Sequence, residues 1–440
     1  MKKQLLILAM FFVTFAAIVM MTACTTNEAE FDLTSEQPAK QSLSDIRSYE
    51  EALQIAQNSI SLLNSGEATR SSSIRKINLA DSKVVMRNAG TRFSDGGSDT
   101  LMYVFNFEDN QGFAIVSASK STEGLLAVTE KGYYDPEEGS NVESFNFFME
   151  KARDYVAKAP KLRFPPDLPI IESRDSFAYE ITTKGPFLTV EWGEVLPEGE
   201  LCPNGRSGCA NTAMAQVLSY YGLPTGIDIN YPGADVSYQA LDWTQMKAHQ
   251  TGHSVGSCLT TTTHQAISRL LRQLGKMSAS SYVTSSPTGG PQTYTVSEVK
   301  IPHVLDSLGY MYTNWSTYDF DNHIKYQLNA LHPLILDGTS VKNGISISHN
   351  WVIDGYIISK TYHYVLVHPL GNINEWVIDS VTVTTKKLCH YNWGWYGDCN
   401  GYFASGVFDT QEPDVPTLSS EHDHDFSSGE VKVLPVYPVQ

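Results

Sequence analysis

The fold is organised around one stretch, Gly208-Cys209-Ala210-Asn211-Thr212-Ala213-Met214-Ala215-Gln216-Val217-Leu218-Ser219-Tyr220-Tyr221-Gly222. Its apolar residues recur at helical spacing, which predicts a helix with one buried face that ends at Gly222. Cys209 would lie in the first turn, where free N–H groups and the helix dipole favour an anion and lower the pKa of a thiol. A nucleophilic cysteine and a structural buried cysteine both fit this stretch taken alone.

The rest of the second half changes from a helical to a β pattern. Residues 263–274 and 297–308 are also predicted helices. From about Tyr310 onward, short β-branched and aromatic segments are separated by turn residues: 334–336, 351–353, 364–367 and 376–378. Helices followed by strands predict an α+β class with a helical lobe and then an antiparallel β lobe.

Two polar residues in the β region have the chemistry that a cysteine nucleophile needs, a base and a group that orients the base. His349 opens the segment Ser348-His349-Asn350-Trp351-Val352-Ile353-Asp354-Gly355-Tyr356, at the mouth of a predicted strand. Asn392 lies in Tyr391-Asn392-Trp393-Gly394-Trp395, where an amide could hold an imidazole and Trp393 could shield the bond from water. The chain order Cys, His, Asn matches the thiol-protease triad.

The first half predicts a separate, smaller α+β domain. Ser48-Tyr49-Glu50-Glu51 is a capping box that opens a helix. Residues 101–107 and 113–117 form a predicted hairpin, and a helix is predicted over 142–156. The proline-rich residues 159–169 cannot be regular structure, so we expect a domain boundary there or within the next fifteen or so residues.

The N-terminus carries an export pattern. Two lysines and an apolar run are followed by Thr22-Ala23-Cys24, the order of a secretory signal. A cysteine at this point resembles the bacterial lipoprotein signal, in which Cys24 is lipidated. A transmembrane anchor is the alternative, but the run is short and polar residues follow it. We expect an exported lipoprotein of the outer membrane, on its periplasmic or surface face, or one secreted after processing.

The composition bears on the class of partner, on the cysteines and on the histidines. A net charge of −17 and a pI near 5.1 argue against nucleic acid. Five cysteines would follow the lipidated one, so one thiol is left over if the others pair, and Cys209 is the natural free one. Cys389 and Cys399 could bridge an aromatic segment, but the pairing among Cys202, Cys258, Cys389 and Cys399 stays open. His422 and His424 are expected in a solvated loop rather than a metal site, and the other histidines apart from His349 in surface or turn roles.

The segments around Cys209, His349 and Asn392 together resemble the streptopain family of papain-like cysteine peptidases. Asp242-Trp243 and the strand His332-Pro333-Leu334-Ile335-Leu336-Asp337-Gly338 fit the same family, and the Ser48 helix with the strand at 112–117 resembles its inhibitory prodomain. The resemblance implies a papain-like two-lobed catalytic domain preceded by a small α+β prodomain. Its boundaries would be 1–23 lipoprotein signal, 24–41 polar tether, 42–158 inhibitory prodomain, 159–185 activation segment and 186–440 peptidase domain.

By this resemblance, Cys209 is the nucleophile, His349 the general base and acid, and Asn392 the orienter, with Trp393 packed beside it. The family places glutamine two residues after a tryptophan, where its amide stabilises the oxyanion, but this chain has Trp192-Gly193-Glu194. An ionised Glu194 would repel the developing charge, a protonated one could donate, and a Glu194 that points elsewhere would do neither.

The implied molecule is a zymogen that cleaves proteins or peptides, without metal or organic cofactor, and is anchored to a membrane by lipid on Cys24. Activation would be a proteolytic cut between about Pro160 and Pro186. The peptide bonds at Lys161, Arg163, Arg174 and Lys184 are the accessible candidates. The alternatives are a catalytically impaired lipoprotein that only binds, which Glu194 favours, and a thiol amidase acting on cell-wall peptides.

Overall fold

The computed structural model describes residues 46–64, 75–86, 100–159, 173–249, 261–286, 290–342, 345–367, 377–408 and 431–439. The chain divides into two units, Met1–Leu43 and Ser44–Gln440, and the first lies outside the described residues. The signal segment, Cys24, Cys258, His422 and His424 therefore remain at the level of sequence expectations. Within the described ranges, no helix is long and apolar enough to cross a membrane.

Residues 46–159 form a helix-covered antiparallel sheet, as predicted. Helix α2 (Tyr49–Asn64) begins with the capping box, because the Ser48 N–H donates to Glu51 Oε2 at 2.8 Å and the Glu51 N–H to Ser48 Oγ at 3.2 Å. The predicted hairpin is β2 (Thr100–Phe107) with β3 (Phe113–Ser117), and the predicted second helix is α3 (Glu143–Ala157). The other elements are β1 (Ile77–Met86), η1 (Glu108–Asn110) and β4 (Leu125–Thr129).

The helical lobe follows the predicted pattern. Helix α4 (Cys209–Tyr221) is almost wholly buried and ends at Gly222, whose φ of 68° is the left-handed conformation that glycine adopts without strain. Helices α6 (Thr262–Met277) and α7 (Ser297–Ser307) pack against it. The shorter elements are α5 (Trp243–Ala248), α8 (Lys325–Asn329), η2 (Phe320–Ile324), β6 (Gly226–Asp228), β7 (Tyr238–Ala240), β8 (Ser281–Val283) and β9 (Gln292–Tyr294).

The β lobe has fewer and longer strands than the sequence pattern indicates. Strand β13 (Ile345–Val367) is continuous, whereas we expected separate strands at 351–353 and 364–367 with turns between them. The chain passes Asp354-Gly355 with a register irregularity against β14 (Val377–Asn392) instead of turning, because β14 pairs with β13 on both sides of this point. On the other edge of β13, the partner changes from β12, whose pairing ends at Ile353, to Ser173–Lys184, whose pairing begins at Tyr356. The remaining strands are β10 (Tyr310–Tyr312), β11 (Ser316–Thr317), β12 (Leu334–Lys342), β15 (Gly401–Ala404) and β16 (Val431–Pro438), with η3 (Ser405–Val407).

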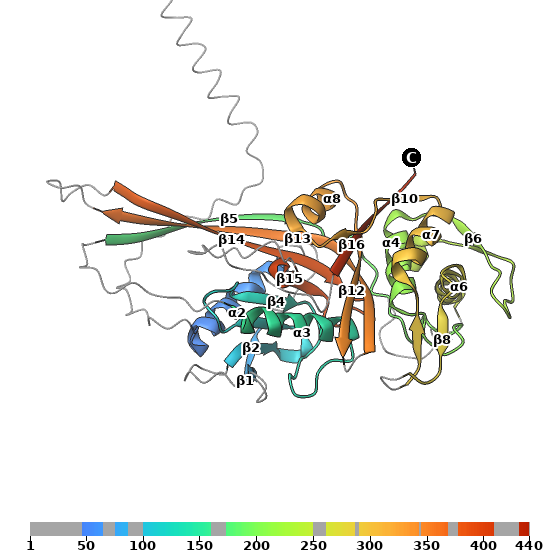
Figure 1. The fold of residues 1–440 in the computed structure, drawn as a ribbon, viewed down its shortest axis with the longest axis horizontal. Helices are drawn as coiled ribbons and strands as arrows, with labels where there is room; N and C mark the ends of the chain where they lie inside the picture. The colour runs from blue at the N-terminus through green and yellow to red at the C-terminus, as the bar shows by residue number, and fades with distance from the viewer. Residues whose placement is uncertain are drawn as a thin grey trace, which may run out of the picture. The chain divides into compact units, whose positions relative to one another are not determined.

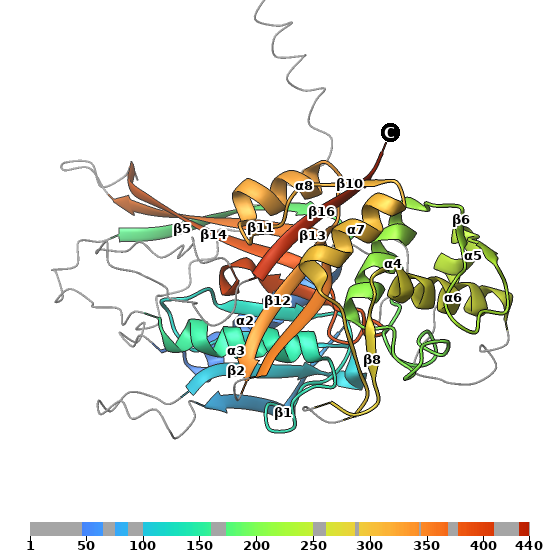
Figure 2. The same cartoon turned by 45° about the vertical axis from the view of Figure 1, so that its right-hand side comes forward.

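One twelve-stranded sheet connects the two halves of the second unit. Ten of its strands follow the order β1-β2-β3-β4-β15-β14-β13-β12-β16-β10, and the other two lie off this path, with β11 paired to β16 and Ser173–Lys184 (β5) paired to β13. The predicted prodomain joins the β lobe where β4 pairs with β15. In Figure 1, α2 and α3 lie on one side of β12 while α4, α6 and α7 lie on the other, and the turned view of Figure 2 agrees. Two apolar cores result, one shared by the prodomain and the β lobe and one between α4 and the sheet.

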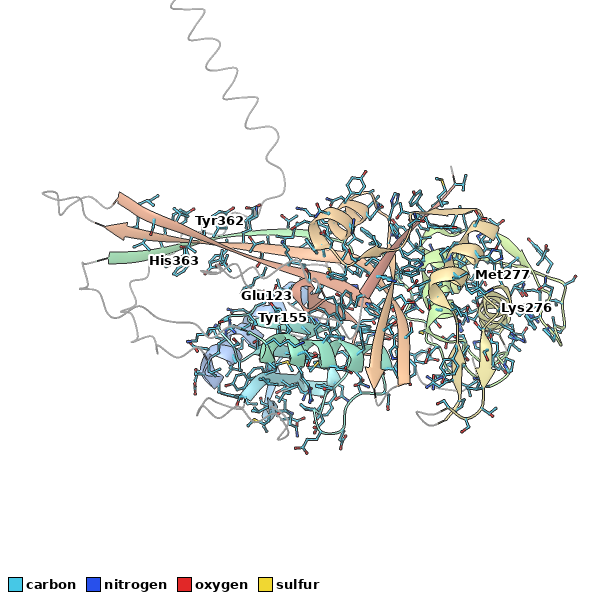
Figure 3. The ribbon with its side chains drawn as sticks, in the orientation of Figure 1. Glu123, Tyr155, Lys276, Met277, Tyr362 and His363 are labelled. Atoms are coloured by element: carbon cyan, nitrogen blue, oxygen red, sulfur yellow. The ribbon has the colours of Figure 1, made fainter. Side chains whose placement is uncertain are left out.

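The second half of the predicted linker is a regular strand. Residues Ser173–Lys184 form β5, which pairs antiparallel with β13 from Ser173↔Val367 to Lys184↔Tyr356. The alternation of Phe177, Tyr179 and Ile181 with polar residues was the signal for this strand. With β14, these strands form a three-stranded ribbon that carries Tyr362 and His363 (Figures 1 and 3). Only residues 160–172 of the expected activation segment remain outside the described structure.

Candidate active site

Cys209 is the first residue of α4 and lies beside β13. Gly208 precedes it with a φ of 87°, and a Cβ there would come within 2.9 Å of the Thr293 side chain, so this sharp entry into the helix requires glycine. The Cys209 Sγ–H contacts Asn350 Oδ1 at 3.9 Å. Asn350 is itself fixed, since Ser297 Oγ donates to its Oδ1 at 2.7 Å. The helix start therefore holds the sulfur against the strand that carries His349.

His349 is the neighbour of Asn350 on β13, and successive strand residues point to opposite faces of the sheet. Its Nδ1 lies 3.8 Å from Glu143 Oε2, a carboxylate at the first position of α3 in the predicted prodomain. Gln292 Nε2 donates to the other oxygen of Glu143 at 2.9 Å. Burial lowers the pKa of His349, and Glu143 and Asp337 act in the opposite direction. In this state the imidazole is turned toward the prodomain.

Cys209 contacts Asn350, the residue that follows His349 on β13. Among the described residues, neither side chain hydrogen-bonds to the other. The same two carboxylates, Glu143 and Asp337, nevertheless act electrostatically on both groups. Burial, followed by the charge of Glu194, raises the pKa of the Cys209 thiol to about 12, so the sulfur is protonated at neutral pH.

Asn392 lies outside the contacts of His349 in this state. Its Oδ1 accepts from Gln216 Nε2 at 3.0 Å and its Nδ2 donates to the Val190 carbonyl at 2.9 Å. Trp393 follows it and packs against Trp351, with ring centroids 5.2 Å apart. The amide thus anchors β14 to α4, which was not the contact expected from the sequence.

Glu194 points into a buried ion pair. Its Oε1 accepts from Arg206 Nη2, and the Arg206 Cζ lies 5.5 Å from the centroid of the Trp395 ring. Burial raises the pKa of the Glu194 carboxyl, and the Arg206 guanidinium counteracts that rise. The charge of Glu194 adds to the rise in the pKa of the Cys209 thiol, and Arg206, three residues before Cys209, is its counter-ion. The effect of Glu194 on the oxyanion stays a prediction.

Two histidines that we expected at the surface or in turns are buried. His390 Nδ1 bonds to Asp354 Oδ1 at 2.6 Å, and its Nε2 lies 3.5 Å from Glu130 Oε1 in the predicted prodomain. His264 bonds to Glu200 at 3.1 Å. The surface prediction failed for both because their partners are carboxylates far away in the sequence.

The possible Cys389–Cys399 bridge is not formed. Among the described residues, none of Cys202, Cys209, Cys389 and Cys399 is in a disulfide. Tyr318 Oη donates to Cys389 Sγ at 3.2 Å, and Ser140 Oγ lies 3.8 Å from Cys399 Sγ, so the two sulfurs have different neighbours. Within the described ranges, no cluster of histidine, cysteine and carboxylate side chains could hold a metal.

Comparison with known proteins agrees with this organisation. Residues 190–403 match the model of the peptidase C10 family, and residues 40–156 match that of the Spi protease inhibitor. Residues 190–403 of this chain belong to the peptidase C10 family. The chain is a cysteine peptidase zymogen with an inhibitor prodomain, as the resemblance to streptopain predicted.

The relatives of this C10 peptidase are distant. Streptopain of Streptococcus pyogenes is 22% identical over 341 residues, which cover 70% of this chain and 74% of streptopain. A prointerpain A fragment of Prevotella intermedia is 22% identical over 80% of this chain and 98% of its own, with a TM-score of 0.45. Active interpain A of the same organism is 23% identical over 57% of this chain and 94% of its own, with a TM-score of 0.34.

Sequence reasoning missed four charged residues around the site of this C10 peptidase: Glu130, Glu143, Arg206 and Asp337. Arg206 could have been noticed as a cation one turn before the cysteine. Nothing in the sequence pairs Glu143 with His349 or Glu130 with His390, because these contacts cross between segments more than 200 residues apart.

Proposed function

We propose that this C10 peptidase is an exported, lipid-anchored zymogen that hydrolyses peptide bonds in proteins through Cys209 and His349. The observation that carries the proposal is the placement of Cys209 at the N-terminus of a buried helix, against the strand that presents His349. A helix N-terminus favours the thiolate, and a strand fixes the base.

The chemistry uses groups that the chain itself supplies. The Cys209 thiolate attacks the peptide carbonyl, and its electron pair forms the carbon–sulfur bond while the carbonyl π pair moves to oxygen. His349 gives the proton it took from sulfur to the leaving amine, and a thioester remains. Water, deprotonated by His349, then hydrolyses the thioester. Asn392 orients the imidazole once it turns toward sulfur, with Trp393 packed beside the amide.

The prodomain prevents this chemistry in two ways. First, α3 places Glu143 Oε2 3.8 Å from Nδ1 of the His349 imidazole, so a prodomain carboxylate lies against the proposed base. Second, the thiol is protonated in the zymogen, because burial raises its pKa to about 12, and the charge of Glu194 and then that of Glu143 in the prodomain add to the rise. Pairing of β4 with β15 and packing of Phe147 on Trp351, 6.0 Å between ring centroids, hold α3 in place. Proteolytic removal of the prodomain frees both groups.

Active-site labelling tests this function. The chain is activated, treated with a thiol-directed epoxide and given casein, alongside Cys209→Ala, His349→Ala and the matched control Cys202→Ala. We expect the epoxide on Cys209, cleavage of casein, loss of cleavage in the first two variants and normal cleavage in the control. Labelling without casein cleavage would indicate a narrower amidase, and an unlabelled Cys209 would indicate a binding protein.

The lipid anchor rests on Thr22-Ala23-Cys24 and is tested separately. Cells that express the chain are grown with a radiolabelled fatty acid and fractionated. We expect label on the wild type and its recovery with membranes, and neither for Cys24→Ser. An equally labelled Cys24→Ser variant would show that Cys24 is not the site of lipidation.

A further inference from the structure

The Glu194–Arg206 pair lies next to the nucleophile and has no assigned role. The turn that leads into α4 is tied to Glu194 by its backbone, since the Ser207 N–H donates to the Glu194 carbonyl at 2.7 Å and Ser207 Oγ donates to it at 3.2 Å. Arg206 belongs to this turn. The ion pair and the reactive sulfur therefore share one rigid backbone segment.

The Arg206 side chain is held in place, but one of its N–H donors has no acceptor among the described residues. Nη2 binds Glu194 and the guanidinium lies over the Trp395 ring, so its side chain is only 16% exposed. Its Nε–H is buried and has no acceptor among the described residues. A buried donor without a partner is costly, and guanidinium groups are suited to bind oxyanions with several N–H groups at once. The guanidinium therefore keeps a donor that no described residue satisfies.

The local charge depends on the prodomain. In the zymogen, two carboxylates, Glu194 and Glu143, act on Arg206, and the electrostatic interaction between Arg206 and Cys209 is also present. The one cation is then outnumbered by two anions. Removal of the prodomain takes Glu143 away, which leaves a neutral Arg206–Glu194 pair with an unused donor. The activated site therefore accepts new negative charge more easily than the zymogen.

We propose, on the basis of the proposed function, that Arg206 is a catalytic residue that donates to the oxyanion of the tetrahedral intermediate formed at Cys209, with Glu194 positioning its guanidinium. The oxyanion appears when sulfur adds to the carbonyl and disappears when the amine leaves, so Arg206 binds the intermediate more strongly than the substrate. The Cys209 N–H is the second donor. This assignment explains how the peptidase works with a carboxylate where its family has an amide.

The test compares variants of the activated enzyme. Because Arg206→Met alone leaves Glu194 buried without a partner, Glu194→Leu with Arg206→Met is made as well, since apolar replacement of a buried pair preserves folding in many proteins. A second double variant, Glu194→Gln with Arg206→Met, places the family's side-chain amide at position 194. Arg269→Met, at an arginine–carboxylate pair on α6 (2.6 Å to Asp235), is the matched control.

Three measurements separate a catalytic from a structural role: kcat and KM on a peptide amide, inhibition by a peptide aldehyde, and alkylation by iodoacetamide. Loss of an oxyanion donor lowers kcat by roughly 10² to 10³ with little change in KM. The aldehyde adduct also carries an oxyanion, so its affinity should fall in parallel. Alkylation forms no oxyanion and should stay within severalfold of wild type. The amide-containing double variant should regain part of kcat and of aldehyde affinity.

Either of two results would overturn the assignment: a kcat within fivefold of wild type in both variants that lack donors, or a lower kcat with unchanged aldehyde affinity. A wild-type enzyme whose Cys209 is not alkylated would overturn the proposed function itself, and this inference with it.

Discussion

Glu143 Oε2 of the prodomain lies 3.8 Å from Nδ1 of His349 in the β lobe, and this contact joins the first turn of α3 to the catalytic strand β13. The distance is too long for a hydrogen bond, so the effect of Glu143 is electrostatic and steric. The same carboxylate also acts on the Cys209 thiol. One prodomain carboxylate therefore acts on both proposed catalytic groups, in each case as a smaller effect than burial.

Glu143→Gln should make the uncleaved zymogen more reactive. Without the charge of Glu143, the pKa of the Cys209 thiol falls. Removal of one nearby negative charge should raise the thiolate population roughly three- to tenfold. The measurement is the rate of iodoacetamide alkylation at pH 8, before any cleavage. Glu150→Gln, an exposed residue of the same helix, is the control. Equal rates for the two variants would show that Glu143 does not influence the thiol.

The maturation cut should fall before β5. Proteolysis requires a segment that can leave its partners, and Ser173–Lys184 is paired with β13 along its whole length. Among the expected sites, we therefore favour Lys161 and Arg163 over Arg174 and Lys184. Intact-mass analysis of the mature protein should show a chain that still contains Ser173.

The same cut can be tested by substitution. Lys161→Ala with Arg163→Ala should slow maturation, and Arg174→Ala with Lys184→Ala should not. A mature N-terminus after Lys184 would contradict the protection of β5.

Cys209→Ala should leave the full-length chain uncut if maturation is autocatalytic. The substitution removes the nucleophile and no large contact, so the variant should fold as the wild type does. Gel analysis over time gives the result, and added active enzyme should process the variant in trans. Normal maturation of pure Cys209→Ala would mean that another protease makes the cut.

His390 should make the stability of the zymogen depend on pH. Burial acts to lower its pKa, but the charges of Asp354 and Glu130 outweigh burial and raise it to about 10. A raised pKa means that the stabilisation is complete below the unfolded value of about 6.5 and is lost as pH rises toward 10. The pKa of the Glu130 carboxyl is lowered, so the stabilisation that Glu130 contributes is lost only at acid pH.

His390→Gln should therefore lower the free energy of unfolding by about 3 kcal/mol near pH 6 and by much less at pH 10. Urea unfolding of the Cys209→Ala zymogen at both pH values measures this difference. His303→Gln, at an exposed position of α7, is the control. A loss that is the same at both pH values would show that His390 acts only through packing.

The sequence by itself determined the local features. The Ser48 capping box, the 101–117 hairpin and the helix that begins at Cys209 each depend on a short local segment, and the structure confirms them. The change from helices to strands follows from such local segments taken one after another. Cys209 could be selected because a glycine-led helix is a local pattern. The expected position of His349 at the mouth of a strand was wrong, because β13 begins at Ile345 and His349 pairs with Gly338 inside the ladder.

Only the tertiary structure decided what these residues touch. The imidazole faces Glu143, the Glu194 carboxylate is balanced by Arg206, and His390 is buried between Asp354 and Glu130. Strand β13 continues through Asp354-Gly355 because β14 pairs with it on both sides of this point, whatever its local turn propensity. Hydrophobic periodicity reports the environment of a residue along its own element, whereas pairs of charges across elements depend on packing between segments that are far apart in the chain.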